Sequence, residues 1–255
     1  MDESTAPEKY LGCKLITVPA PTGKMNPEDI EAKIQRLDDQ HHPQAKVISL
    51  SQSTEYGTVY TIPELKAISA LAKKYKLYFH MDGSRISNAA VSLNAGFASF
   101  TRDTGVDVLS FGGTKNGMMF GEAVVVFNPE LGRDMKYFRK QGMQLHSKMR
   151  FVGAQFTALL SNDLWKKNAS HSNRMASLLA LELGKIKEVR ITQSVDANAV
   201  FALLPERIIP QLQEENFFYV WNDRTTEVRL MCAFDTTEEE VKNFAVKLRA
   251  LLTTA

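Results

Sequence analysis

The stretch Leu77-Tyr-Phe-His-Met-Asp-Gly-Ser-Arg85 decides the predicted fold class. Its apolar first half predicts a buried strand that ends at Asp82, Gly83 permits a sharp turn, and Arg85 begins a helix. Similar apolar runs predict further strands at 14–18, 46–50, 106–111 and 123–127. Because these strands alternate with helix-like segments, the sequence predicts an α/β protein with a mainly parallel sheet.

Helix-start signals and a change of pattern define the expected domains. Asn26-Pro-Glu-Asp29 and the capping box of Thr61 and Glu64 begin helices in the first half. A mostly helical region follows from about 137 to 185. Short strands are then expected near 189–193, 200–204, 217–221 and 228–232, with helices near 205–215 and 236–252 and a capping box at 236–239. We therefore expect a large α/β domain over residues 1–160 and a small α+β domain over residues 161–255.

Composition excludes several classes of protein. Hydrophobic residues make up 44% of the 255 residues and charged residues 24%, so the chain can bury a core. Its 31 basic and 29 acidic residues leave a net charge of +2, without the basic excess of a nucleic-acid binder. Cys13 and Cys232 lack metal-type spacing, no apolar run reaches membrane length, and the N-terminus lacks a signal-peptide core. We expect a cytoplasmic protein without a structural metal.

Polar residues at the ends of the predicted strands are the first candidates for a site, because parallel sheets bind ligands at their carboxyl ends. Asp82 could hold a protonated ring nitrogen, and Arg85 a phosphate or carboxylate. The alternative is that Asp82 only caps the next helix, and spacing alone leaves this open. His80 shares a strand face with Asp82, but without a third ligand a hydrogen-bonded core histidine is favoured over a metal site.

The glycine-rich turn Phe111-Gly-Gly-Thr-Lys-Asn-Gly117 provides the second candidate. It lacks the residue order of a nucleotide-binding P-loop and precedes a strand, not a helix. A partly desolvated lysine such as Lys115 can form a Schiff base with an aldehyde, although most loop lysines are simply solvated. An aspartate for the pyridine nitrogen and a lysine for the aldehyde are the two fixed points of a pyridoxal phosphate site. Asp82 and Lys115 would supply them.

An arginine inside the apolar strand 227–233 provides the third candidate. Arg229 would be costly to bury alone, and the carboxylate of an amino-acid substrate would pair with it through two hydrogen bonds. A salt bridge at a strand edge is the alternative. The basic residues between 133 and 150 are interpreted as a solvated helix face.

Taken together, these motifs resemble those of a known family. His80-Met-Asp-Gly-Ser-Arg85 and Ser110-Phe-Gly-Gly-Thr-Lys-Asn-Gly117 are similar to motifs of the low-specificity L-threonine aldolases. These enzymes are fold-type I pyridoxal phosphate enzymes of the beta-eliminating lyase and aldolase group. Ser53-Thr-Glu-Tyr-Gly-Thr-Val-Tyr60, Lys148-Met-Arg-Phe151 and Arg229-Leu-Met-Cys232 resemble the same branch. The resemblance extends from about residue 2 to the end.

The resemblance implies a role for each matching residue. Lys115 corresponds to the lysine that forms the internal aldimine, and Asp82 to the acid that keeps the pyridine nitrogen protonated. Arg85 corresponds to the arginine near the cofactor hydroxyl, and Arg229 to the anchor of the substrate carboxylate. The resemblance also suggests Thr114 at the cofactor phosphate, and Lys148 and Arg150 beside the substrate.

The implied reaction is retro-aldol cleavage of L-threonine or L-allo-threonine to glycine and an aldehyde, by a homodimer or homotetramer. The family also has a phosphate-binding glycine/threonine loop and a ring-stacking histidine before the helix at Pro27, which are not found here. We therefore expect a chain that is short at its N-terminus. Two alternatives are another pyridoxal phosphate lyase, racemase or aminotransferase, and an incomplete fragment that only associates with an intact subunit.

Overall fold

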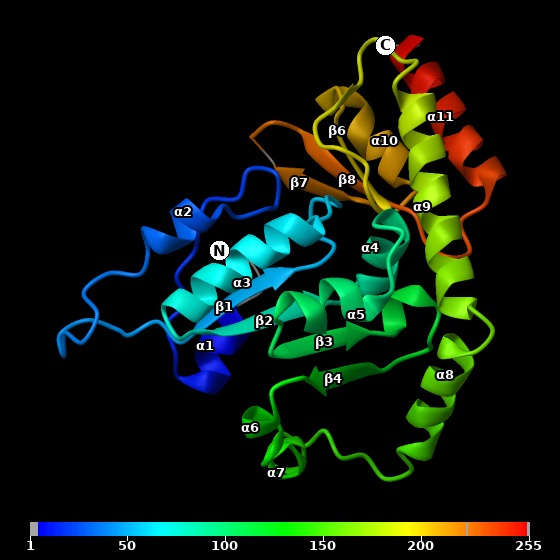
Figure 1. Ribbon diagram of the computed structural model, residues 1–255. Coiled ribbons are helices and arrows are strands. Elements are labelled where there is room, and N and C mark those ends of the chain that lie inside the picture. The colour runs from blue at the N-terminus through cyan, green and yellow to red at the C-terminus, as the bar shows by residue number, and fades with distance from the viewer. Residues whose placement is uncertain (1–4, 223, 254–255) are drawn as a thin grey trace.

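The computed structural model describes residues 5–222 and 224–253, and a four-stranded sheet forms the centre of its first part (Figure 1). The strands β1 (Val47–Ser51), β2 (Tyr78–Gly83), β3 (Val108–Gly112) and β4 (Glu122–Val126) lie in that order. β1, β2 and β3 are parallel, whereas β4 is antiparallel to β3. The connection over residues 113–121 is too short for the crossover that a parallel neighbour needs, so the chain reverses there. The expectation of a mainly parallel sheet is confirmed.

One face of this sheet carries the first hydrophobic core. Helices α3 (Ile62–Lys74) and α5 (Phe97–Phe100) lie in front of the strands in Figure 1 and pack on their apolar side chains. The predicted capping box begins α3, since the Thr61 amide donates to Glu64 Oε2 at 2.6 Å. The short helix α2 (Pro27–Glu31) follows Asn26 as expected.

The opposite face of β2 carries polar side chains, because successive residues of a strand point to opposite sides. Phe79 and Met81 are buried in the core, whereas His80 and Asp82 lie on the other face. The His80 ring nitrogens lie 2.8 Å from Ser49 Oγ and 3.1 Å from Ser110 Oγ. These bonds satisfy both ring nitrogens, as the interpretation of a core histidine requires.

The prediction of a strand at 14–18 is wrong. Helix α1 (Ala6–Leu11) ends at Gly12, and the chain continues without a strand to residue 20. Leu15 and Ile16 both remain exposed. Val18 packs against the first core, but Leu15 and Ile16 gain no apolar burial that would favour pairing with a sheet.

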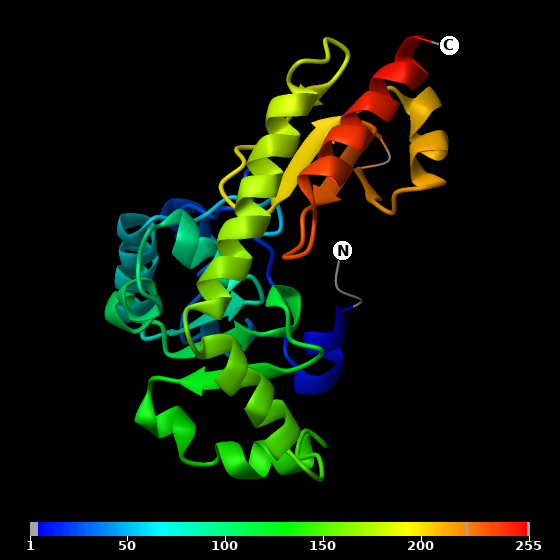
Figure 2. The same ribbon diagram turned by 90° about the vertical axis from the view of Figure 1, so that its right-hand side faces the viewer.

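Four helices lead from β4 to the second sheet. They are α6 (Pro129–Gly132), α7 (Met135–Gln141), α8 (Arg150–Leu160) and α9 (Leu164–Leu183). α9 runs along both parts of the molecule, since it packs on α4 (Ile86–Ser92) and on α11 (Glu238–Thr253) (Figure 2). The Asn88 side chain donates to Ser172 Oγ at 2.9 Å and fixes the α4 contact. Because α9 belongs to both packing units, the boundary at 160 and 161 stays a prediction.

The second sheet is antiparallel and has the order β5-β6-β8-β7. Its strands are β5 (Arg190–Ile191), β6 (Ala199–Leu203), β7 (Tyr219–Asn222) and β8 (Glu227–Met231). α9, α10 (Ile209–Gln213) and α11 contribute to the second core around these strands. The capping box predicted at 236–239 is displaced by one residue: Glu240 N donates to Thr237 Oγ1, while Thr236 Oγ1 accepts from Ala233 N at 2.8 Å. In the part of the chain described, no helix has the length and apolar character to cross a membrane.

Candidate active site

The turn after β2 places Asp82 and Arg85 at the carboxyl edge of the first sheet. Asp82 Oδ1 accepts hydrogen bonds from the Ser84 amide at 2.8 Å and the Ser84 hydroxyl at 2.7 Å. Asp82 therefore does stabilise the turn before α4, but with one oxygen only. Within residues 5–222 and 224–253, Oδ2 has no hydrogen-bond partner, which leaves it open to a ligand.

The turn after β3 places Lys115 beside this first turn. β2 and β3 pair so closely that a Cβ on Gly112 would lie 2.3 Å from the Ser84 carbonyl oxygen. Lys115 belongs to the short 3-10 helix η3 (Thr114–Asn116), and the next residue fixes it. Asn116 donates its side-chain amide to the Trp165 carbonyl at 3.0 Å, and Asn168 donates to the Asn116 carbonyl at 2.9 Å. The lysine is thus presented by a rigid turn.

Arg229 reaches the site from the second sheet. It lies in β8, an interior strand between β6 and β7, and only 9% of the residue is exposed. Its guanidinium carbon is 4.9 Å from the ring centroid of Trp221. Nε has no hydrogen-bond partner, and Arg229 forms no ion pair with any described residue. The alternative of a salt bridge at a strand edge is therefore wrong, and a buried guanidinium in this state favours an anionic ligand.

Electrostatic interactions show that these residues gather in one place. Burial, together with the positive charge of Arg229, lowers the pKa of Arg85 to about 10. Burial also lowers the pKa of Lys115, with smaller contributions from Arg85 and Arg229, while Asp82 and Glu122 oppose the shift. Lys115 remains accessible at the sheet edge while its amine is partly desolvated, and its lowered pKa makes it a better amine nucleophile.

The other three predicted site residues, Thr114, Lys148 and Arg150, do not contact Asp82, Lys115 or Arg229 through any hydrogen bond or ion pair of the described residues. Thr114 Oγ1 accepts from the Gly121 amide at 2.9 Å and closes the loop between β3 and β4. Lys148 and Arg150 are exposed at the start of α8. In Figure 1 this end of α8 lies below β4, whereas β8 lies at the top of the molecule. The structure does not bring Lys148 and Arg150 to Arg229, and their role beside the substrate stays a prediction.

Sequence reasoning missed three residues around the site. Trp221 supports the Arg229 guanidinium, and the Glu122 carboxylate accepts from the Gly113 and Thr114 amides at 3.2 and 3.3 Å. Glu55 acts electrostatically on both arginines. Glu55 belongs to a motif quoted above for its resemblance alone, and no spacing rule connects Trp221 or Glu122 to the site.

The donor set fits pyridoxal phosphate. Asp82 has an open carboxylate oxygen for a protonated ring nitrogen, and Lys115 has a lowered pKa suited to an aldehyde. The unpartnered Nε of Arg229 is suited to the carboxylate of an amino acid.

Comparisons with known proteins agree with this chemistry. The family model for beta-eliminating lyases matches residues 1–206. The low-specificity L-threonine aldolase of Pseudomonas aeruginosa is 41% identical over 252 residues, which cover 98% of this chain and 73% of that protein. A second such enzyme, from a Pseudomonas strain, is 40% identical with the same coverage. The structure of Leishmania major threonine aldolase is 31% identical, with a TM-score of 0.90 over 98% of this chain and 74% of that chain.

The contact between Gly112 and Ser84 gives a first testable prediction. Gly112→Ala would drive a methyl group into the Ser84 backbone, so we expect the free energy of unfolding to fall by about 1–3 kcal/mol. Urea denaturation measures this change. The control is Gly153→Ala in α8, where an added Cβ meets nothing within 4 Å. An unchanged stability of Gly112→Ala would contradict the close approach of the two turns.

Proposed function

We propose that this chain cleaves β-hydroxy-α-amino acids, because it belongs to the beta-eliminating lyase family and within it to the low-specificity L-threonine aldolases. Its substrates are L-threonine and L-allo-threonine, its products are glycine and an aldehyde, and its cofactor is pyridoxal phosphate. The observation that carries the proposal is the convergence of Asp82, Lys115 and the unpartnered Arg229 at the junction of the two sheets.

Each residue contributes a distinct interaction. The Arg229 guanidinium binds the substrate carboxylate through parallel hydrogen bonds and orients the amino acid. Asp82 would hold the protonated ring nitrogen of pyridoxal phosphate, and the Lys115 amine would hold its aldehyde group. Arg85 adds positive charge beside them. When bound, pyridoxal phosphate supplies the electron sink that stabilises negative charge at the substrate Cα.

Other pyridoxal phosphate reactions use the same lysine and aspartate, since the pocket selects the bond that breaks. The alternatives of another lyase, a racemase or an aminotransferase are not favoured, because the relatives at 40% and 41% identity and the structure at 31% identity are all named as threonine aldolases.

The proposed reaction predicts a covalent cofactor adduct and a defined product pair. Titrating the purified chain with pyridoxal phosphate is expected to produce a new absorbance band, and borohydride reduction is expected to fix the cofactor on Lys115. The Lys115→Ala variant is expected to show neither. Incubation with L-threonine is expected to give glycine and acetaldehyde; ammonia and a keto acid would indicate elimination instead, and the absence of any adduct would refute the proposal.

The role of Arg229 gives a prediction that separates binding from chemistry. Arg229→Lys keeps the charge but loses the paired hydrogen bonds, so we expect KM for L-threonine to rise about 10-fold or more. Steady-state kinetics measure the change. Arg190→Lys on β5, an exposed arginine of the same sheet, is the control and is expected to keep the parent KM. An unchanged KM in Arg229→Lys would remove the carboxylate assignment.

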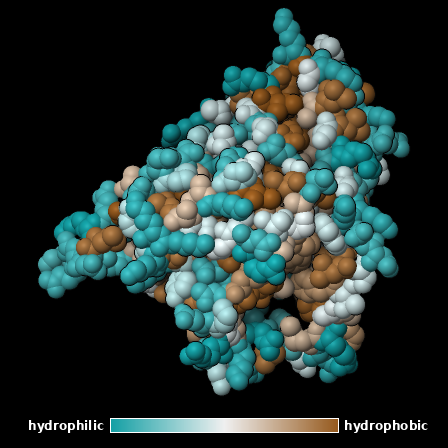
Figure 3. Space-filling model, in the orientation of Figure 1, coloured by the Kyte–Doolittle hydropathy of each residue, from teal (hydrophilic) through white to brown (hydrophobic). Residues whose placement is uncertain are grey.

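We further propose a cytoplasmic homo-oligomer, a homodimer or homotetramer. Both cysteines are free, in agreement with a reduced compartment. Exposed apolar side chains, among them Val124 on β4 and Phe151 on α8, support association. Figure 3 shows apolar side chains around a hollow in the lower part of the molecule, where β4 and α8 face each other.

The oligomer proposal is tested by the mass in solution. Sedimentation equilibrium at micromolar concentration is expected to give twice or four times the mass of the chain, because burying this apolar surface favours association. A single species with the mass of one chain would contradict it.

A further inference from the structure

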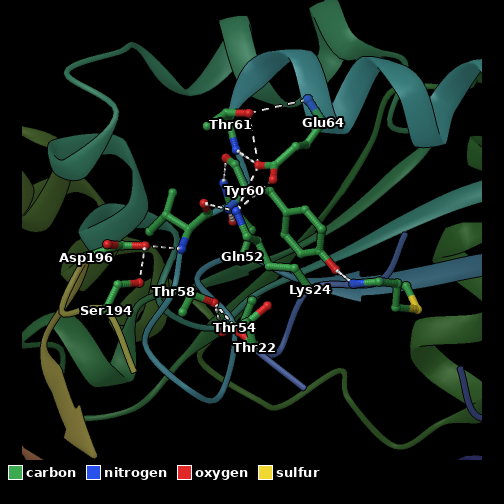
Figure 4. Close-up of polar contacts among 12 residues, drawn as sticks. Thr22, Lys24, Gln52, Thr54, Thr58, Tyr60, Thr61, Glu64, Ser194 and Asp196 are labelled. Carbon is green, nitrogen blue, oxygen red and sulfur yellow. Dashed lines mark hydrogen bonds and ion pairs between the residues drawn. The ribbon is translucent and has the colours of Figure 1, made fainter. Parts of the chain in front are cut away.

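The loop between β1 and α3 is built as a rigid support for one carboxylate. We call residues 52–60 the Glu55 loop. Gln52 and Tyr60 exchange two hydrogen bonds of 2.9 and 3.0 Å at its base (Figure 4). Thr54 and Thr58 are joined through their hydroxyl groups at 2.7 Å above this base. Hydrogen bonds within the loop therefore hold its shape, and Glu55 lies between the paired residues Thr54 and Thr58.

The second sheet, together with the loop between its strands β5 and β6, fixes the position of the Glu55 loop. The Val59 amide donates to Asp196 Oδ2 at 3.1 Å, as Figure 4 shows. The Tyr56 ring lies 6.0 Å from the ring of Trp221, the same tryptophan that supports Arg229. Glu55 thus follows the carboxyl end of β1. Its neighbour Tyr56 packs beside Trp221, the ring that contacts Arg229.

The carboxylate of Glu55 is available to a ligand. Glu55 is half-buried, and among the described residues it has no hydrogen bond and no ion pair through its side chain. Its negative charge nevertheless acts on both Arg85 and Arg229, opposing the decrease that burial causes in the pKa of each arginine. The free Glu55 carboxylate therefore lies close enough to both guanidinium groups for its charge to act on them.

The proposed cleavage requires such a group. Arg229 is suited to the substrate carboxylate, and Lys115 would hold the cofactor to which the substrate amine binds. The β-hydroxyl group still needs a proton acceptor. Asp82 binds Ser84 through Oδ1, and its open Oδ2 is assigned to the cofactor ring nitrogen. Glu122 accepts from the amides of its own loop, and His80 is held between two serines. Among the described groups near the site, the Glu55 carboxylate is free for this task.

We propose that Glu55 is a catalytic residue that accepts the hydrogen bond of the substrate β-hydroxyl group and takes its proton when the Cα–Cβ bond breaks. The inference rests on the proposed function. The O–H bond breaks as the proton moves to the Glu55 carboxylate, and the oxygen electrons form the C=O bond of the aldehyde. The electron pair of the Cα–Cβ bond remains with Cα, which takes a proton from water to complete glycine, and Glu55 then releases its proton to water. The overall reaction needs neither an oxidant nor a reductant.

The test compares a substrate that has the hydroxyl group with a ligand that lacks it. Glu55→Gln in the cofactor-loaded protein is expected to lower kcat for L-threonine about 10²-fold to 10⁴-fold, the usual contribution of a general base. Glycine has the same carboxylate and amine but no β-hydroxyl group. We expect glycine affinity, measured by absorbance titration, and exchange of its Cα hydrogen with deuterated water, measured by NMR, to stay within about threefold of the parent.

Three comparisons make the outcome decisive. Glu55→Asp keeps a carboxylate and is expected to recover part of the cleavage rate, whereas Glu188→Gln, an exposed glutamate outside the site, is expected to match the parent. Equal cleavage by the parent and Glu55→Gln would overturn the inference alone. Parallel losses of cleavage, glycine affinity and glycine exchange would overturn it in favour of a role in holding the arginines. No acetaldehyde from the parent would overturn the proposed function as well.

Discussion

The close approach of two turns at the carboxyl ends of β2 and β3 is the constraint on which the site depends. Parallel pairing sets Asp82 opposite Ser110, and the absence of a side chain at Gly112 lets the backbone of Ser84 come within contact distance. Two turns that are far apart in sequence thereby present an acid and an amine to one ligand. The geometry comes from backbone packing, so the acid and the lysine need no direct bond to stay together.

The second sheet adds a buried arginine, Arg229, to the acid and the lysine of the first sheet. β8 is an interior strand, so Arg229 is held by β6 and β7 on both sides and by the Trp221 ring at one face. Interior strands tolerate a charged residue only when it has a partner or a ligand. The Glu55 loop connects the second sheet to the first, because Tyr56 packs against Trp221 of β7 and against Phe201 of β6.

Local signals in the sequence were sufficient for most elements and for part of the site. Capping at Thr61 and the alternation around Asp82 are properties of neighbouring residues, so they predict α3 and β2 correctly. The direction of β4 depends on the length of the connection before it, and the absence of a strand at 14–18 depends on the lack of a burying partner. Trp221 and Glu55 enter the site only through contacts between sheets, which no local pattern records.

The charges of the site explain why this arrangement suits anionic ligands. Burial is the main cause that lowers the pKa of Lys115 and of Arg85, and the positive charge of Arg229 lowers both further, a sign of repulsion between cations in a partly desolvated space. The negative charge of Asp82 opposes the decrease in the pKa of Lys115 and of Arg85 but does not cancel it. Such strain at a site is relieved when a ligand brings negative charge, and a ligand that binds only the folded state also stabilises it. Binding of a phosphorylated cofactor and an amino-acid carboxylate would therefore add favourable negative charge beside these three cations.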